Sequence, residues 1–289
     1  MFEIGDLIDD QYRIVRLIGE GGQGTVFEAE DSEIGAPVAI KVLKPQVAAR
    51  PEWVIRLRRE ARAMGVLSGT AAVQIFALNR TQAGQLYIVM ELLRGQDLEQ
   101  CIKRFESRYG FVPVPTMLDL LGPIVDTLEV AHARGIVHRD LKPANIFVLD
   151  STARGRVRLL DFGMIKDLSA NTPLTREGFV VGSPSYIAPE GWRGNSTNIT
   201  HAADVYALGA LVFRILTGHV PFQGEQLVDI VRLVTRGPRP SVVSTRTSLP
   251  KAIDPWVAKA LAIAPDDRFK SVREMWNELL PILGTNTAT

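Results

Sequence analysis

Two short polar stretches, separated by an apolar segment, constrain this chain more than any other feature. The first is His-Arg-Asp-Leu-Lys-Pro-Ala-Asn and the second, shortly downstream, is Asp-Phe-Gly. They place the carboxylate of Asp140, the cation of Lys142 and the amide of Asn145 in one tight loop, followed by a second carboxylate, Asp161. Phosphoryl transfer needs a carboxylate that orients a hydroxyl, a cation that neutralises the moving charge, and oxygen ligands for Mg²⁺. The pattern therefore indicates phosphoryl-transfer chemistry.

A glycine-rich turn near the N-terminus offers a second phosphate-binding element. Gly19, Gly21 and Gly24 precede Val26 in the pattern G-x-G-x-x-G-x-V, in which glycines let backbone N–H groups approach phosphate oxygens. Dinucleotide-binding folds use the same glycine spacing, but there the loop opens into a helix. Residues 25–30 alternate as a strand would. A hairpin that covers nucleotide phosphates therefore fits better than a dinucleotide loop or an ordinary flexible turn.

Lys41 lies in the middle of an apolar stretch, residues 37–43, that reads as a strand. A charge in such a strand is costly unless it is paired; the alternative is a strand-edge lysine that reaches water. Residues 51–67 carry apolar side chains at helical spacing. Glu60 lies beside that apolar stripe, so we expect it to face Lys41, the alternative being a surface glutamate paired with a neighbouring arginine.

In this order the motifs resemble those of the eukaryotic-type protein kinase family. The resemblance is to its serine/threonine branch, and within that branch to the bacterial members. The resemblance runs from about Tyr12 to Leu280 and includes Val-Ala-Ile-Lys ending at Lys41 and Ala-Pro-Glu ending at Glu190. It implies an α+β, two-lobed protein-kinase fold with ATP in the cleft between the lobes. The expected small lobe, 1–92, is an antiparallel sheet plus one helix. The expected large lobe, 93–280, is mainly helical, and 281–289 is expected to be a flexible tail.

The resemblance also implies a role for each polar residue of the two stretches. Asp140 is the expected general base or substrate-orienting acid, and Lys142 is expected to contact the γ-phosphate. Lys41, paired with Glu60, is expected to hold the α and β phosphates. The metal ligands implied for Mg²⁺, with Mn²⁺ as the alternative, are Asn145 and Asp161.

The remaining ATP contacts follow from the same resemblance. They comprise the glycine-rich turn, a gatekeeper, the backbone that hydrogen-bonds adenine, a ribose contact, and side chains above and below the adenine ring. Plain core packing of the apolar members is compatible with these roles. The residues are Gly19, Gly21, Gly24, Val26, Ala39, Met90, Glu91, Leu93, Asp97 and Phe147.

Residues 161–190 resemble an activation segment, with a polar middle. In the family, an arginine in the position of Arg139 pairs with a phosphate on this segment and orders it. We therefore expect autophosphorylation, with Thr175 the first candidate and Thr172 the second. The alternative is that both are merely solvated loop hydroxyls.

Structural roles are expected for several further residues. By resemblance, Asp204 begins the buried helix that anchors the catalytic loop, His138 packs near Phe162, and Arg268 pairs with Glu190. A second amphipathic helix is expected at residues 116–134, and a last one at 271–280. The other histidines are expected to be core or surface filler: His132, His201 and His219.

Net charge, apolar stretches and cysteine content limit the classes of partner and the cellular compartments that suit this chain. The net charge of +1 gives no electrostatic case for a nucleic-acid or membrane-surface partner. The longest apolar stretch, 205–216, is too short to span a bilayer, and the single cysteine, Cys101, suits a reducing compartment. We expect a cytoplasmic location, as a free enzyme or as the cytosolic domain of a longer membrane-anchored protein.

The expected substrates are proteins that present serine or threonine, and a homodimer is the expected unit if autophosphorylation occurs in trans. Two alternatives remain. One is a nucleotide-binding pseudokinase scaffold, although pseudokinases usually lack one of the roles assigned above. The other is a small-molecule kinase, which the docking stretch at 182–190, typical of protein-directed members, disfavours.

Overall fold

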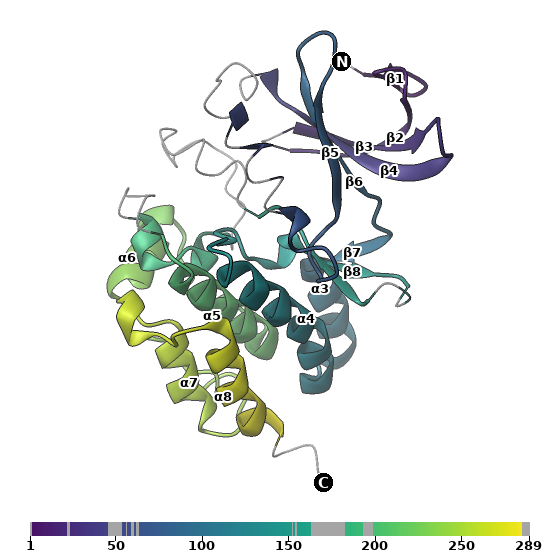
Figure 1. Cartoon of the computed structure of the whole chain (residues 1–289). Coiled ribbons are helices and arrows are strands. Elements are labelled where there is room, and N and C mark those ends of the chain that lie inside the picture. The colour runs from purple at the N-terminus through teal and green to yellow at the C-terminus, as the bar shows by residue number, and fades with distance from the viewer. Residues whose placement is uncertain are drawn as a thin grey trace. The chain divides into compact units, whose positions relative to one another are not determined.

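The chain forms two compact units in its computed structural model (Figure 1), one ending at Arg94 and the other beginning at Gly95. We call them the N-terminal unit and the C-terminal unit. The structure describes residues 2–21, 24–45, 54–55, 57–58, 61, 64–151, 153, 155–162, 183–192 and 199–284.

The N-terminal unit is built on an antiparallel sheet in the order β1-β2-β3-β4-β6-β5. Its strands are β1 (Leu7–Ile8), β2 (Tyr12–Glu20), β3 (Gly24–Asp31), β4 (Ala36–Leu43), β5 (Ile75–Arg80) and β6 (Leu86–Glu91). The strands predicted at residues 25–30 and 37–43 correspond to β3 and β4. Strand β5 begins at Ile75; before it, the Thr70 hydroxyl accepts a hydrogen bond from the Ala72 N–H (3.1 Å) and holds the chain in a turn.

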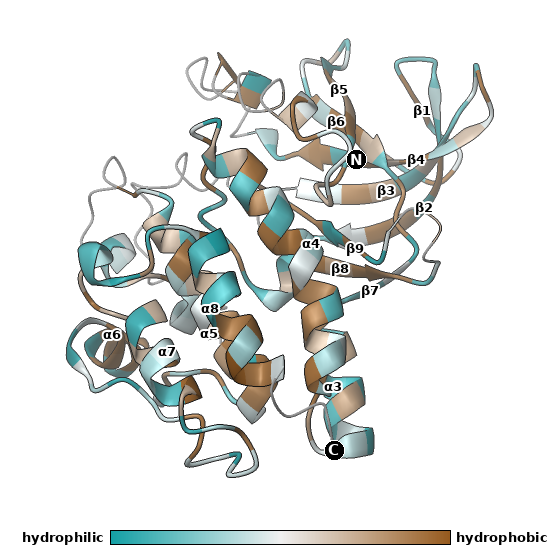
Figure 2. Ribbon diagram, turned by 60° about the horizontal axis from the view of Figure 1, so that its bottom comes forward, coloured by the Kyte–Doolittle hydropathy of each residue, from teal (hydrophilic) through white to brown (hydrophobic). Residues whose placement is uncertain are grey.

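The two faces of this sheet bury different apolar clusters. Val38, Ile40 and Val42 of β4 belong to one cluster, whereas Leu43 belongs to the other, as the two-residue period of a strand requires. Apolar residues recur along β3 and β4 in Figure 2. Val54 and Leu57, which have helical backbone, pack with Leu43 in the second cluster. The apolar stripe predicted for residues 51–67 is therefore confirmed where the structure describes it.

The C-terminal unit joins a small sheet to a set of helices. The sheet has the order β7-β8-β9, with β7 at Gly95–Asp97, β8 at Ile146–Leu149 and β9 at Val157–Leu159. The helices that the structure describes here are α3 (Leu98–Tyr109), α4 (Val114–His132), α5 (Ala202–Thr217), α6 (Leu227–Arg236), α7 (Ile253–Ala260) and α8 (Val272–Gly284).

Helix α5 is the core of this unit, as the apolar stretch 205–216 predicts. Every residue of α5 except Ala203 is buried. Helix α4 covers most of the range predicted for it, 116–134, and buries Leu121, Val125 and Leu128. Among the helices in the described part of the chain, none has both the length and the hydropathy needed to cross a bilayer.

Helix α8 begins as predicted but ends later. The Ser271 hydroxyl accepts a hydrogen bond from the Glu274 N–H (3.0 Å) and caps the helix. The expected end at Leu280, with a flexible tail over 281–289, is wrong for residues 281–284, which remain helical. Pro281 removes one backbone donor, but Leu283 is buried and holds the last turn against the unit. Residues 285–289 lie outside the described part.

Candidate active site

A buried carboxylate at the start of α5 holds the loop at residues 138–145 in place. We call this segment the catalytic loop. Asp204 accepts hydrogen bonds from the backbone N–H groups of His138 (2.8 Å) and Arg139 (2.8 Å). It also accepts one from Nε2 of His132 (2.8 Å). Burial alone would raise the pKa of Asp204, but the hydrogen bond and charge of His132, with the nearby His138, outweigh burial and lower it. An ionised carboxylate therefore anchors this loop, and the anchoring role predicted for the helix that carries Asp204 is confirmed.

His132 is the residue that the sequence analysis assigned wrongly. A lone histidine in a helix is usually filler, but here the ring contacts Asp204, which lies 72 residues further along the chain. Only the folded structure brings these two residues together, so no local pattern could reveal the contact.

His138 ties the catalytic loop to the segment that leads to Asp161. Its Nδ1 accepts the Asp140 N–H (3.2 Å), so the ring proton belongs on Nε2, which donates to the carbonyl of Leu160 (2.8 Å). The ring lies 4.7 Å from that of Phe162, which confirms the predicted packing. Burial lowers the pKa of His138, against the opposing influence of Asp204. The imidazole is therefore a neutral structural link between the two polar stretches.

The polar residues of the catalytic loop converge on Asp140. Nζ of Lys142 lies 3.2 Å from Oδ2 of Asp140. The side-chain amide of Asn145 donates to the Asp140 carbonyl (2.7 Å), and the Leu160 N–H donates to the Asn145 carbonyl (2.8 Å). The structure thus brings Asp140, Lys142 and Asn145 together and places the segment carrying Asp161 beside them.

Backbone conformations at this site are uncommon ones. Arg139 has φ of 65° and Asp161 has φ of 45°, in the left-handed region that side chains other than glycine seldom adopt. Each such residue costs about 1–3 kcal/mol and persists only where the surroundings fix it. The Asp204 carboxylate bonded to the Arg139 N–H is one such constraint. Strain next to both carboxylates supports a functional reading of this loop.

The donor set of the two polar stretches fits a hard divalent cation. The NH₂ group of Asn145 donates to the Asp140 carbonyl, which orients the amide and makes its oxygen the atom that could coordinate a cation. Asp161 supplies a carboxylate. Mg²⁺ is usually held by one or two such oxygen ligands together with substrate phosphates. Among the described residues, no group of three or more His, Cys, Asp or Glu is placed to hold a metal ion.

In the N-terminal unit, the sheet register places four of the predicted ATP residues on one face. Val26 pairs with Lys41 across β3 and β4, and Ala39 pairs with Met90 across β4 and β6. Ala39 and Lys41 are two residues apart, so all four side chains point to the same side of the sheet. Leu43 lies on this side too and packs against the helical residues Val54 and Leu57. Lys41 is 8% exposed, so the apolar strand buries the lysine as its sequence indicates.

The glycine-rich turn has the geometry of a close backbone approach. A Cβ atom on Gly24 would lie 2.1 Å from the Val42 carbonyl oxygen, so no side chain fits there. At Gly19 and Gly21 a Cβ would meet nothing within 4 Å. The Gly21 N–H donates to the Gly24 carbonyl (2.9 Å) and closes the turn. A ligand could therefore approach the backbone at Gly19 and Gly21, while the fold requires a glycine at position 24.

The other residues predicted to contact ATP lie at the end of the N-terminal unit and in the small sheet of the C-terminal unit. The Glu91 N–H donates to the Gln74 carbonyl (3.0 Å), and its side chain accepts from the Gln74 N–H (2.8 Å). Leu93 is half-buried. In the C-terminal unit, Asp97 and Phe147 are paired across β7 and β8. Asp97 also caps α3, since Oδ1 accepts the Gln100 N–H (2.8 Å), a role that the sequence analysis missed.

Three predicted residues lie outside the part of the chain that the structure describes: Glu60, Thr172 and Thr175. Most of the predicted activation segment is also outside it. Its C-terminal end is described, and there Glu190 accepts two hydrogen bonds from Arg268, at 2.8 and 2.7 Å. The Arg268 side chain is 0% exposed. The predicted pair between Glu190 and Arg268 is confirmed.

The sequence of this chain matches a family of known proteins. Residues 12–277 match the protein kinase domain family. The chain belongs to the protein kinase family. Members of this family use ATP together with a divalent metal ion and act on protein substrates. The expected fold of an antiparallel N-terminal sheet and a helical C-terminal unit is the fold observed for this kinase domain.

The kinase domain has bacterial relatives. It is 36% identical over 271 residues to the serine/threonine-protein kinase Pkn1 of Myxococcus xanthus, covering 93% of this chain and 38% of Pkn1. It is 36% identical over 280 residues to the probable serine/threonine-protein kinase PknB of Lactococcus lactis, covering 96% and 43% respectively. The PknI kinase domain of Mycobacterium tuberculosis has a similar crystal structure, with a TM-score of 0.74, 27% identity and coverage of 97% of this chain and 99% of that one. The kinase domain thus spans about two fifths of the two curated relatives.

Proposed function

We propose that this kinase domain transfers the γ-phosphate of ATP to serine and threonine hydroxyls of protein substrates. The observation that carries the proposal is the contact between Asp140 and Lys142, 3.2 Å apart in a loop fixed by Asp204. A lysine two residues after the aspartate is the serine/threonine pattern. The names of the bacterial relatives, which are serine/threonine-protein kinases, support the same specificity.

In the proposed reaction, Asp140 orients the substrate hydroxyl and accepts its proton. The hydroxyl oxygen forms a bond to the γ-phosphorus as the bond from that phosphorus to the bridging oxygen of ADP breaks. Lys142 lies close enough to Asp140 to offset the negative charge on the group in transfer. Asn145 and Asp161 would hold Mg²⁺, or Mn²⁺ in its place, which supplies further charge neutralisation on the phosphates.

Nucleotide contacts are proposed for residues of each unit. In the N-terminal unit, Lys41, paired with Glu60, would hold the α and β phosphates beneath the glycine-rich turn. The apolar side chains on the same sheet face would contact adenine, with Met90 as gatekeeper and the Glu91–Leu93 backbone as its hydrogen-bonding partner. In the C-terminal unit, Asp97 would contact ribose and Phe147 the adenine ring.

A nucleotide-binding scaffold without catalysis is the alternative. It is disfavoured because each role in phosphoryl transfer has a residue of suitable chemistry. These residues are also linked to one another, since Nζ of Lys142 lies 3.2 Å from Oδ2 of Asp140 and the Asn145 amide donates to the Asp140 carbonyl (2.7 Å).

Regulation is proposed to occur through phosphorylation of the segment that follows Asp161. Thr175 is the first candidate and Thr172 the second, with a homodimer as the unit that phosphorylates in trans. We further propose a cytoplasmic setting, where ATP is available, for a free enzyme or for the cytosolic part of a longer membrane-anchored protein.

The intact mass of the purified chain, before and after incubation with ATP and Mg²⁺, tests this proposal. We expect a gain of one or more phosphates that maps to Thr175 or Thr172, and no gain in a Lys41→Met variant, because that variant lacks the cation for the α and β phosphates. Equal phosphate gain in both proteins would contradict the assignment of Lys41. ATP binding with no gain in either, and no transfer to added protein, would favour the scaffold.

A further inference from the structure

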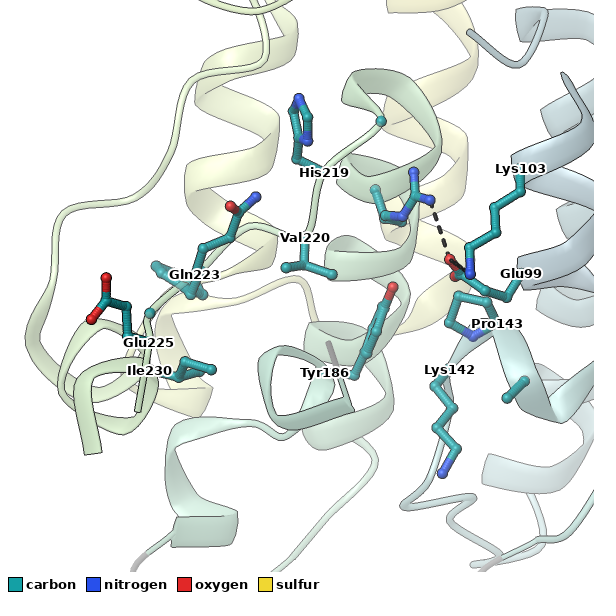
Figure 3. Close-up of a pocket in the computed structure, with 15 residues that line it drawn as sticks. Glu99, Lys103, Lys142, Pro143, Tyr186, His219, Val220, Gln223, Glu225 and Ile230 are labelled. Atoms are coloured by element: carbon teal, nitrogen blue, oxygen red, sulfur yellow. Dashed lines mark hydrogen bonds and ion pairs between the residues drawn. The ribbon is translucent and has the colours of Figure 1, made fainter. Parts of the chain in front are cut away.

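A cavity of about 660 Å³ adjoins the catalytic loop and is lined entirely by residues of the C-terminal unit. Figure 3 shows it opening between Lys142 and Pro143 on one side and Val220 and Gln223 on the other. Lys142 extends away from the cavity wall that carries Tyr186 and Glu99 (Figure 3), and its Nζ contacts Asp140. The cavity therefore lies next to the reacting groups, where a side chain that neighbours the acceptor residue of a substrate would be placed.

The back wall of the cavity is a buried arginine whose charge is already matched. Arg214 of α5 donates from Nη1 and Nη2 to the two carboxylate oxygens of Glu106, and from Nη2 to Glu99 (3.2 Å). The Arg214 side chain is 8% exposed. Burial disfavours the charged guanidinium, but the hydrogen bond to Glu106 and the charges of both glutamates outweigh burial and raise the pKa of Arg214. Both α3 carboxylates are thus engaged by an arginine that stays ionised.

Two further groups make the cavity better suited to hydrogen-bond acceptors and anions than to hydrogen-bond donors. The hydroxyl of Tyr186 lies buried with no hydrogen-bond partner among the described residues, within reach of the charges of Glu99 and Arg214. Lys103, whose side chain is 68% exposed, lies 3.8 Å from Glu99 at the rim. A buried hydroxyl gains by donating to an incoming acceptor, and Lys103 can turn its charge toward an anion.

A basic side chain that entered the same cavity would find both α3 carboxylates engaged and would be repelled by two cations. Its natural partners, Glu99 and Glu106, are held by Arg214, and Arg214 itself and Lys103 repel a third cation. Like charges brought together in a desolvated site cost several kcal/mol. The exposed Glu225 at the rim is too open to solvent to offset that cost.

We propose that this cavity is a specificity subsite that accepts an acidic side chain close to the phosphorylated serine or threonine, with Arg214 as the residue that excludes basic ones. The inference rests on the proposed kinase function and names the class of protein segment on which it acts. Arg214 is thus a specificity determinant of this chain, whereas Lys103 and Tyr186 assist by attraction and hydrogen bonding.

Serine peptides in which each position near the acceptor is in turn glutamate, glutamine or arginine test the proposal. We expect one position at which kcat/KM is about tenfold or more higher for glutamate than for arginine, given the cost of like-charge contact. In an Arg214→Gln variant, Glu99 and Glu106 are released, so the order at that position should reverse. Arg232→Gln, which removes an exposed guanidinium of α6 outside the cavity, should leave the order unchanged.

Two additions keep the test decisive. Should Arg214→Gln fail to fold, Lys103→Gln alters an exposed residue and is expected to lower the preference for glutamate severalfold. Fluorescence anisotropy of the same peptides gives Kd values without turnover, so an inactive chain would refute the proposed function and still report on the subsite. Preference for arginine in the unaltered chain, or an unchanged order in Arg214→Gln, would overturn the proposal.

Discussion

Replacing Asp140 with asparagine is expected to lower kcat of phosphoryl transfer by about 10²- to 10⁴-fold, the usual contribution of a positioned general base. The amide has the shape of the carboxylate but can neither accept the substrate proton nor balance Lys142, which lies 3.2 Å away. The loop itself should survive, because it is held by Asp204 through backbone N–H groups that the substitution leaves intact.

The measurement is the initial rate of phosphate transfer from ATP to a protein substrate, with the melting temperature recorded alongside. Asp126→Asn is the matched control, since Asp126 is an exposed carboxylate that pairs with Arg273 far along the chain. The control should retain the full rate. Asp140→Asn with a rate within a few fold of the unaltered chain would show that Asp140 does not act on the hydroxyl.

Removing Glu190 by substitution with alanine is expected to destabilise the C-terminal unit by about 3 kcal/mol, the lower end of the range for stranding a buried charge. Arg268, whose side chain is 0% exposed in the unaltered chain, would lose both carboxylate contacts, at 2.8 and 2.7 Å. The lower end applies because Arg268 also donates to the carbonyls of Ala202 (2.8 Å) and Ala262 (2.8 Å), which soften the loss.

Urea unfolding followed by circular dichroism measures this change. Asp119→Ala provides the comparison, because its pair with Arg156 (3.3 Å) is exposed on both sides and such pairs contribute at most about 1 kcal/mol. A double variant, Glu190→Leu with Arg268→Met, should lose less than the sum of the two single changes, since no unpaired charge remains. Equal losses for Glu190→Ala and Asp119→Ala would contradict a buried ion pair.

The sequence predicted the parts of this fold that depend on local patterns. The alternation of β3 and the apolar runs of β4 and α5 are short-range signals, because each reflects the surface that one element buries. The catalytic loop was equally predictable from the sequence, since its chemistry needs a carboxylate, a cation and an amide within a few residues. The predicted links of His138 to Phe162 and of Glu190 to Arg268 came from the family resemblance, and the structure contains both contacts.

The contacts that were not predicted join residues far apart in the chain. His132 meets Asp204 across 72 residues, and Arg214 meets Glu106 across 108. Nothing near either residue in the sequence marks such a partner. The longer α8 has a similar cause, because the burial of Leu283 is a tertiary effect that overrides the local signal of Pro281. Glu60, Thr172 and Thr175 stay predictions.

The most direct test of the central claim is transfer of phosphate from ATP to three peptides that differ only in a serine, threonine or tyrosine acceptor. We expect serine and threonine to be phosphorylated. The rate for tyrosine should be lower by at least about 100-fold, because a misplaced acceptor loses the alignment that the reaction requires. Transfer to tyrosine alone, or ATP binding without transfer to any of the three, would contradict the account.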